Sequence, residues 1–254
     1  MAVSIPPFHW WRTVFFLIPA IGVCTIVLGV VSIGSSLFGR RGDLGHRCAR
    51  GWSWLILATT GVDVDFHGAE HLTPGASYVF TANHQSMYDI PIVFWSLSHQ
   101  LRIIAKRSLG RFPVLGWHLQ RTGHVLVDRS KPGHEVFRCI AAAIDRGLSL
   151  IVFPEGTRSV DGRLGRFKKA IFVIAIDASI PVVPLSITGS RHVMRRGRLM
   201  TCPGHVRLTV HPPIATEGLS RDDAGDLADR VQAIVATGVE ANGHAAKPGV
   251  VVGT

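Results

Sequence analysis

The stretch FTANHQSMYDIPI, residues 80–92, decides the fold class and points to the chemistry. It opens as an apolar strand, breaks at the polar residues Asn83, His84 and Gln85, and resumes an apolar pattern after Asp89. Because five residues on one ideal helix turn by about 500°, we predict that His84 lies in the loop leaving the strand and that Asp89 lies in the first turn of the next helix. A carboxylate there suits the helix dipole and can accept a hydrogen bond from imidazole Nδ1, which leaves Nε2 as a neutral base. Taken alone, this pattern fits a structural histidine beside a helix cap at least as well.

The chain after Gly61 repeats this alternation of strand and helix. Helical patterns separate short apolar runs, which indicates an α/β fold with a largely parallel mixed sheet flanked by helices. Open sheets of this kind bind ligands outside the carboxyl ends of their strands, where His84 would lie. The expected strands are SYVFTA (77–82), LRIIAK (101–106), HVLVDR (124–129), LSLIVFPEG (148–156), IPVVPLSI (180–187) and HVRLTVHP (205–212), and the expected helices cover residues 89–98, 113–121, 132–146, 167–178 and 221–238.

The N-terminal part of the chain is apolar and predicts a membrane-associated pair of helices. Residues 13–38 contain no charged side chain and can cross a bilayer core of about 30 Å, although insertion from one side, or burial as a core helix, also fits. Residues 51–62 are too short to span and suit an interfacial position, with Trp52 and Trp54 at headgroup depth. The first run is followed by Arg40, Arg41, Arg47 and Arg50 and preceded by Arg12 alone. This bias predicts an inner-membrane protein whose remaining residues face the cytoplasm.

Composition narrows the choice of partners. Hydrophobic residues make up 47% of the 254 residues and charged residues 17%, which suggests contact with lipid. The formal charge of +10 suits an anionic partner, such as a phospholipid surface, a phosphorylated substrate or nucleic acid. No nucleic-acid recognition motif accompanies the charge, which argues against the last of these. Four cysteines without CxxC spacing indicate a reduced compartment and no disulfide framework.

Two loops at predicted strand ends carry groups suited to a phosphate. In FPEGTRS, residues 153–159, Gly156 permits close backbone approach, Thr157 offers a hydroxyl, and Arg158 offers a planar, bidentate fork. The second loop, AKRSLGRFPVLGW (105–117), groups Lys106, Arg107 and Arg111. Each loop by itself also fits a polar turn that only ends a strand.

Two other patterns are weighed and set aside. HGAEH, residues 67–71, matches the H-x-x-E-H pattern of inverted zinc peptidases. That pattern needs a helix, whereas Gly68, Pro74 and Gly75 indicate a connection between strands, so we expect no metal site. The chain also has no G-x-S-x-G motif, which argues against a serine hydrolase.

Four segments together carry more information than any one of them. NHQSMYD, AKRSLGRFPVLGW…VDRS, FPEGTRS and IPVVPLSI occur in the order and approximate spacing of the four blocks of the glycerolipid acyltransferase family. Over roughly residues 60–215 the chain resembles the 1-acyl-sn-glycerol-3-phosphate acyltransferases of that family. The resemblance implies a general base at His84, oriented by Asp89. It also implies an acceptor-phosphate site held by Lys106, Arg107 and Arg158 and shaped by Glu155, Gly156 and Thr157.

Some residues depart from the family pattern. Arg107 and Ser108 stand where a second lysine and an acidic residue are expected. Ala170 closes FKKA where the family usually has glycine, which puts close backbone approach there in doubt. Neither departure touches the expected catalytic pair.

The resemblance implies an acyl transfer at an anionic membrane surface. The acyl group would pass from acyl-CoA or acyl carrier protein to the free glycerol hydroxyl of lysophosphatidic acid, giving phosphatidic acid without a cofactor. Residues 1–62 would anchor the chain, residues 63–239 would form the acyltransferase domain, and residues 240–254 would be a flexible tail. Two alternatives stay open. One is a related acyltransferase acting on another lysophospholipid or a lyso-aminolipid, and the other is a non-catalytic, basic membrane-binding protein, which leaves the four ordered segments unexplained.

Overall fold

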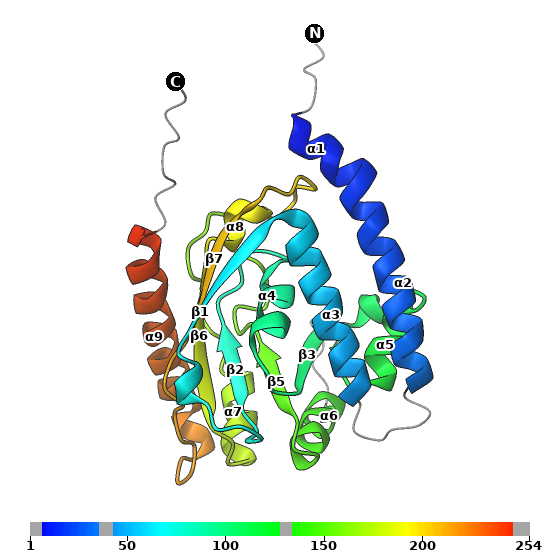
Figure 1. The fold of residues 1–254 in the computed structure, drawn as a ribbon. Coiled ribbons are helices and arrows are strands. Elements are labelled where there is room, and N and C mark those ends of the chain that lie inside the picture. The colour runs from blue at the N-terminus through cyan, green and yellow to red at the C-terminus, as the bar shows by residue number, and fades with distance from the viewer. Residues whose placement is uncertain (1–6, 36–42, 128–133, 246–254) are drawn as a thin grey trace.

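A largely parallel sheet forms the centre of the protein. The structure, a computed structural model, describes residues 7–35, 43–127 and 134–245. Within them seven strands pair in the order β1-β7-β6-β2-β5-β3-β4, and every neighbouring pair is parallel except the antiparallel β6 and β7. The predicted mixed α/β sheet is therefore confirmed (Figure 1). The strands are β1 Val62–His67, β2 Val79–Ala82, β3 Leu101–Lys106, β4 Val125–Val127, β5 Ser149–Val152, β6 Val182–Thr188 and β7 Gly204–Val210.

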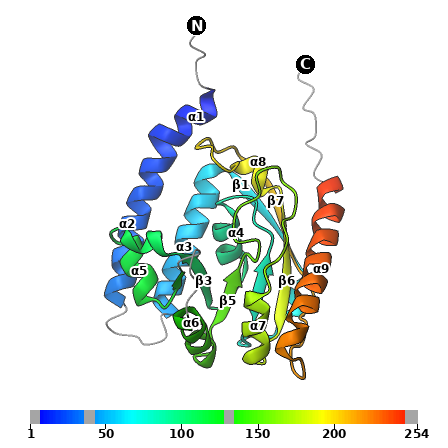
Figure 2. The same ribbon diagram turned by 180° about the vertical axis from the view of Figure 1, so that it is seen from behind.

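Helices cover both faces of the sheet, as the views from front and back show (Figures 1 and 2). One face packs against α3 (Asp43–Thr60) and α4 (Asp89–Ser96), and the other against α6 (His134–Asp145), α7 (Ala170–Asp177) and α9 (Ala224–Ala245). Successive β2 residues point to opposite faces, so Val79 joins one core and Phe80 the other. Burial on both sides explains why the central strands read as continuous apolar runs. The remaining helices are α1 Phe8–Arg12, α2 Ile18–Ser35, α5 Leu115–Arg121 and α8 Ser190–Val193.

Strands β2 and β5 are neighbours in the sheet, and the chain leaves them toward opposite faces of it. After β2 the chain enters α4 on one face, whereas after β5 it enters α7 on the other face. Two parallel neighbours whose connections diverge in this way leave a crevice at their carboxyl ends, which is where open α/β sheets bind ligands. His84 and Glu155 follow these two strands, so both lie at this switch point.

The predicted N-terminal helical pair is present. The helix Phe8–Ser35 is, among the described residues, the one that is long and apolar enough to cross a membrane. It contains a π-helical turn, Thr13–Leu17, just before Pro19, where the missing proline N–H and the bulk of its ring disfavour a regular turn. α3 follows it and contains most of the stretch that the sequence places at the interface, but Ile56 and Leu57 of α3 are buried in the core.

Two regions differ from the sequence prediction. The sequence prediction omits β1, because it relies on continuous apolar runs. Val-Asp-Val-Asp-Phe-His instead alternates apolar and polar residues, as expected for an edge strand with one face exposed to solvent. α9 continues beyond residue 238 to Ala245, so the first residues of the predicted tail are helical. Residues 246–254 of that tail, and the end of the predicted strand 124–129, lie outside the described residues.

Candidate active site

His84 and Asp89 form a buried hydrogen-bonded pair at the carboxyl edge of the sheet. His84 lies in the loop after β2, and Asp89 is the first residue of α4. Nδ1 of His84 lies 2.8 Å from Oδ2 of Asp89. The same oxygen accepts backbone N–H groups of Gln85 at 2.8 Å and Ser86 at 2.9 Å. An oxygen that accepts two backbone N–H groups acts as an acceptor toward the ring as well, so Nδ1 carries the proton and Nε2 keeps its lone pair.

The imidazole plane is fixed by its surroundings. The ring of Phe153, just after β5, stacks on the His84 ring with centroids 4.1 Å apart and planes 21° apart. The Asn83 side chain pairs with the main chain of Ile187 in β6 through two hydrogen bonds of 2.8 Å, which fixes the start of the loop. Nε2 of His84 has no hydrogen-bond partner among the residues described, and the side chain remains 11% exposed. Nε2 therefore remains available as a hydrogen-bond acceptor.

Glu155 joins the two loops at the switch point. Its Oε1 accepts the backbone N–H of His84 at 2.6 Å, and its Oε2 accepts that of Gly165 at 2.8 Å. The backbone N–H of Ser159 donates in return to the carbonyl of His84 at 2.8 Å. Burial raises the pKa of Glu155, and its two backbone hydrogen bonds oppose that rise. Both carboxylate oxygens thus contact main chain, and Glu155 shapes the site by holding the His84 loop.

The rest of the predicted phosphate loop forms a turn beside Glu155. Gly156 has φ of 76°, a conformation that glycine adopts without strain. Thr157 is exposed and Arg158 half-buried, and the Arg158 carbonyl accepts a hydrogen bond of 2.6 Å from the guanidinium of Arg196. This contact fixes the main chain of Arg158 but does not involve its guanidinium.

Lys106 and Arg107 leave the sheet at the same edge. Lys106 ends β3, and Arg107 begins the 3₁₀ helix Arg107–Arg111 that follows. β3 pairs with β5, and β5 with β2, so the carboxyl ends of all three parallel strands adjoin. Both side chains are exposed. The structure therefore brings His84, Asp89 and Glu155 into contact, and places Lys106, Arg107 and Arg158 at the same edge without a mutual hydrogen bond among the described residues.

The segment that matched a zinc motif is not a helix carrying two ligands. His67 ends β1 and pairs with Asp65 at 2.7 Å, whereas His71 ends the 3₁₀ turn Ala69–His71. Gly68 between them is left-handed, with φ of 82°. The two imidazoles therefore do not share the helix face that the motif requires.

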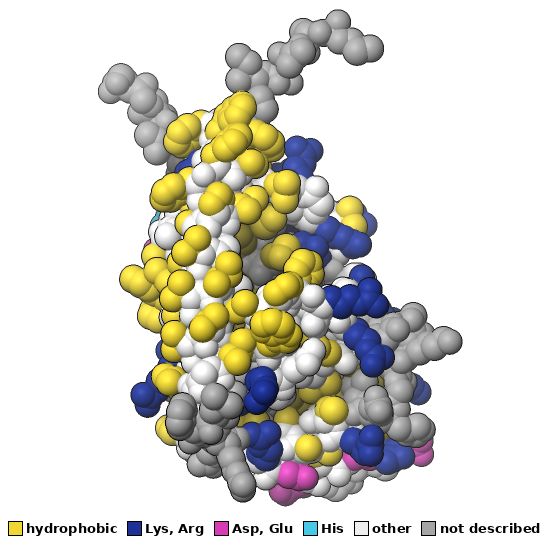
Figure 3. All heavy atoms as spheres, turned by 90° about the vertical axis from the view of Figure 1, so that its right-hand side faces the viewer, with side chains coloured by type: hydrophobic (Ala, Val, Ile, Leu, Met, Phe, Trp, Pro, Cys, Tyr) yellow, Lys and Arg dark blue, Asp and Glu magenta, His cyan; other side chains and the backbone are white. Residues whose placement is uncertain are grey.

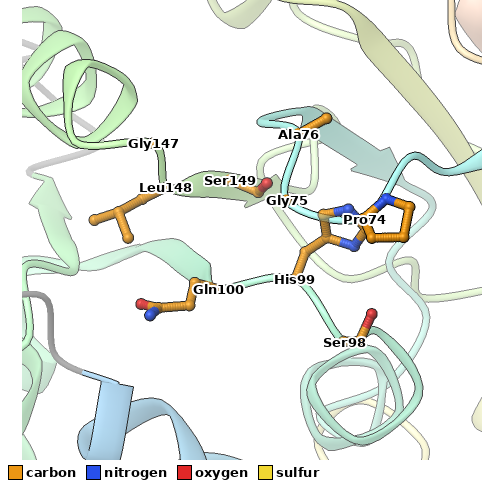
Figure 4. A pocket seen from close by; sticks show the side chains of 9 residues that line it. All are labelled: Pro74, Gly75, Ala76, Ser98, His99, Gln100, Gly147, Leu148 and Ser149. Atoms are coloured by element: carbon orange, nitrogen blue, oxygen red, sulfur yellow. The ribbon is translucent and has the colours of Figure 1, made fainter.

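A pocket of about 380 Å³ opens at the other end of the sheet (Figure 4). Its walls come from the segments before β2 and β3, including His99 and Gln100, and from the start of β5 with the residues before it, including Ser149. The amino ends of these strands are far from the loops that carry His84 and Glu155, because each strand runs the full depth of the sheet between them. This pocket is therefore not the space into which His84 could direct Nε2.

Comparison with known proteins identifies the class. The acyltransferase family model matches residues 63–188. A 1-acyl-sn-glycerol-3-phosphate acyltransferase of Cocos nucifera is 28% identical over 239 residues, covering 88% of this chain and 76% of that protein. A chloroplastic enzyme of the same name from Brassica napus is 36% identical over 203 residues, covering 76% of this chain and 58% of that protein. The crystal structure of the 1-acyl-sn-glycerophosphate (LPA) acyltransferase from Thermotoga maritima has a TM-score of 0.80 and 29% identity, covering 92% of this chain and 96% of that one.

The fold and these matches define an acyltransferase, and the chain belongs to the acyltransferase family. Within that family its similarity is to the 1-acyl-sn-glycerol-3-phosphate acyltransferases, as the four sequence segments imply. The chain spans 58% of the Brassica napus relative and 64% of another from Limnanthes alba, so those proteins contain sequence with no counterpart in the alignment.

Proposed function

We propose that this chain transfers a fatty acyl group from a thioester to the free glycerol hydroxyl of lysophosphatidic acid, giving phosphatidic acid. The observation that carries this proposal is the His84–Asp89 pair, with Nδ1 bonded to the carboxylate at 2.8 Å and Nε2 unpaired among the described residues. An imidazole held in this tautomer can accept the proton of a hydroxyl as that hydroxyl attacks a carbonyl. The names of the relatives supply the acceptor.

The chemistry then proceeds by direct transfer. Nε2 of His84 takes the hydroxyl proton while the acceptor oxygen bonds to the thioester carbon. The tetrahedral intermediate collapses, the C–S bond breaks, and the imidazolium returns the proton to the departing thiolate of CoA or acyl carrier protein. Asp89 stabilises the imidazolium between these steps. Because the acceptor oxygen attacks the thioester directly, no covalent acyl-enzyme forms.

The cations at the sheet edge suit the acceptor's phosphate. Lys106, Arg107 and Arg158 lie at the edge that carries His84, and Gly156 and Thr157 shape the turn between Glu155 and Arg158. A phosphomonoester of charge near −2 can bind guanidinium and ammonium groups through charge-assisted hydrogen bonds. Neutralising one of these cations should therefore matter for a phosphorylated acceptor and much less for a phosphate-free one.

The N-terminal helix supports a membrane-bound position for this site. Phe15, Phe16 and Val23 are each more than 60% exposed. Figure 3 shows hydrophobic side chains gathered along the N-terminal helix, with Lys and Arg side chains beside them. Hydrogen bonds tie the helix to the domain at both ends: Thr13 to Thr201 at 2.8 Å, and Ser32 to His118 at 2.7 Å. A spanning helix would have to break these bonds or draw α5 into the hydrocarbon. We propose that the helix lies in one leaflet of the inner membrane with the catalytic domain on the cytoplasmic side.

The test is an activity assay of the full chain with lysophosphatidic acid and either thioester donor. The wild type should form phosphatidic acid, and His84→Ala should lose about a thousandfold in kcat, because general-base catalysis contributes 10²–10⁴. His192→Ala, an exposed histidine in α8, is the matched control and should retain full activity. Formation of product by His84→Ala within tenfold of the wild type would overturn the mechanism.

A second arm tests the acceptor. Arg158→Ala and Lys106→Ala should lower kcat/KM on lysophosphatidic acid by about tenfold or more, the value of a charge-assisted hydrogen bond, and leave a monoacylglycerol little affected. Equal proportional losses on both acceptors would assign these cations to the donor or to the fold. A greater activity on another lysolipid would move the acceptor assignment to that lipid and leave His84 in place.

A further inference from the structure

The side chain of Lys168 fills the space beside Gly156. A Cβ atom placed on Gly156 would lie 3.0 Å from Nζ of Lys168 and 3.4 Å from its Cε. The ammonium group therefore lies against the turn that leads to Arg158, although Lys168 follows Arg158 in the sequence by a loop. Glycine at position 156 leaves room for it, in addition to allowing φ of 76°.

The backbone of Lys168 is fixed from two sides. Its N–H donates to the carbonyl of Pro154 at 3.1 Å, which ties it to the same turn. The preceding residue, Phe167, is buried, and its N–H donates to the side chain of Gln232 in α9 at 2.8 Å. These contacts fix the backbone from which the Lys168 side chain extends, which limits the positions that its ammonium group can take around Gly156.

The charge of Lys168 is not matched within the described part of the chain. The neighbouring carboxylate of Glu155 uses both oxygens for the backbone N–H groups of His84 and Gly165. No salt bridge joins Lys168 to a carboxylate among the described residues. An exposed ammonium beside a catalytic turn is thus left to an anion from outside the chain.

We infer that Lys168 is a further substrate-binding residue, which contacts the phosphomonoester of the acceptor together with Arg158. The inference rests on the proposed function. Lys168 and Arg158 flank one glycine turn, and that turn follows β5, the immediate neighbour of the strand that leads to His84. A phosphate held there would place the glycerol of the same molecule toward the carboxyl end of β2. The donor also carries phosphates, so the experiment separates the two sources.

The first experiment compares Lys168→Ala with Lys169→Ala in the full chain. Lys169 is the adjacent exposed lysine with the same charge, so it controls for general attraction of anions. On lysophosphatidic acid, Lys168→Ala should lower kcat/KM about tenfold, mainly through KM, and Lys168→Arg should restore part of the loss. Lys169→Ala should change kcat/KM less than twofold. Equal effects of both substitutions would overturn the assignment.

Acceptor and donor arms decide which phosphate is bound. With a monoacylglycerol, the loss in Lys168→Ala should disappear. With a phosphate-free N-acetylcysteamine thioester as donor and lysophosphatidic acid as acceptor, the loss should persist. If it vanishes with that donor instead, Lys168 binds the donor and the inference fails, while the His84 mechanism and the Arg158 result stand.

A double-substitution cycle tests the position of the ammonium group. Gly156→Ala places a methyl group against Nζ, so in the wild-type background it should displace Lys168 as well as strain the turn. In the Lys168→Ala background only the strain remains. The combined loss in kcat/KM on lysophosphatidic acid should therefore be severalfold smaller than the product of the two single losses. Strictly multiplicative losses, with unchanged thermal unfolding, would show that Gly156 does not position Lys168.

Discussion

His84 and a second group of histidines in this protein occupy contrasting environments. His84 lies at the carboxyl edge of the sheet, with one nitrogen on a carboxylate and the other unpaired among the described residues. His46 of α3, His118 of α5 and His124 before β4 lie instead around the buried guanidinium of Arg102, where the N-terminal helices meet the sheet. Burial, and next the charge of Arg102, lower the pKa values of His46 and His118 to about 4 and that of His124 well below its usual value.

The two environments differ in whether the imidazole contacts a carboxylate. His118 bonds Ser32, and His124 accepts the backbone N–H of Ile103. Within the described part of the chain neither ring contacts a carboxylate, and neither nitrogen of His46 has a hydrogen-bond partner. Such rings remain neutral and resist protonation. His84 differs because it contacts the Asp89 carboxylate, which in the proposed mechanism stabilises the imidazolium formed during the reaction. The substitutions below test that difference, in order of decreasing effect.

Asp89→Asn should separate the charge of Asp89 from its geometry. An amide oxygen in the place of Oδ2 can still accept from Nδ1 of His84 and from two backbone N–H groups, so the tautomer is kept. The negative charge is lost, and the amide NH2 takes the place of Oδ1, which is buried without a hydrogen-bond partner among the described residues. We expect kcat to fall about a hundredfold, less than in His84→Ala. Asp145→Asn, at an exposed position, is the control. A loss equal to that of His84→Ala would mean that the amide reverses the tautomer instead.

The placement of this pair follows from local sequence. His84 and Asp89 are five residues apart, and a strand end followed by a helix start fixes their relation without any distant contact. The role of Glu155 is different, because its two partners lie 71 and 10 residues away. Sequence places Glu155 in a polar turn at a strand end, but only the tertiary arrangement shows which N–H groups it accepts.

Glu155 should matter through the loop of His84. Glu155→Ala leaves the backbone N–H groups of His84 and Gly165 unpaired, and each unsatisfied buried donor costs about 1–3 kcal/mol. We expect a lower free energy of unfolding, by about 2–4 kcal/mol, together with a lower kcat. Glu155→Gln keeps one acceptor oxygen and should lose about half as much. Exposed Glu217→Ala should change neither quantity, and unchanged kcat in Glu155→Ala would show that the loop holds His84 without it.

The surroundings of His46 and His118 could not be predicted from the sequence, because they too depend on contacts between distant segments. His46 stands among arginines and glycines in a segment that gives no sign of burial, and His118 lies in a basic region. Their environment arises where α2, α3 and α5 pack together, as in the bond from Ser32 to His118 across 86 residues. A helix apolar and long enough to cross a membrane was predictable from composition, whereas the elements against which it packs inside the protein were not.

Acid should destabilise the fold through these rings. The folded-state pKa values of His46 and His118, about 4, lie below the usual 6.5, so the unfolded chain binds more protons between these limits. The free energy of unfolding should therefore fall as the pH falls from 6.5 to 4, by about 2–3 kcal/mol for each ring. His46→Leu removes a ring that has no hydrogen-bond partner among the residues described, and should reduce this loss by about one ring's share. Denaturant unfolding at pH 7 and pH 5 measures the effect. An unchanged pH dependence in His46→Leu would show that this ring is not the acid-sensitive group.

The smallest expected effect concerns the aromatic rings beside His84 and beside the histidines near Arg102. Phe153 stacks on His84 at 4.1 Å, whereas Phe94 lies 6.1 Å from His46 and 6.2 Å from His124. Phe153→Leu should lower kcat about twofold to tenfold, because an aromatic pair contributes about 0.5–1.5 kcal/mol beyond area burial. KM should not change, since the ring orients the base and is not expected to contact the acceptor phosphate. Phe153→Tyr keeps the stacked ring and should retain kcat.

Phe94→Leu should reduce thermal stability and leave kcat unchanged, because the proposed mechanism gives the histidines near it no role. Equal losses of kcat in Phe94→Leu and Phe153→Leu would show that general loosening of the fold, rather than the orientation of His84, controls the rate.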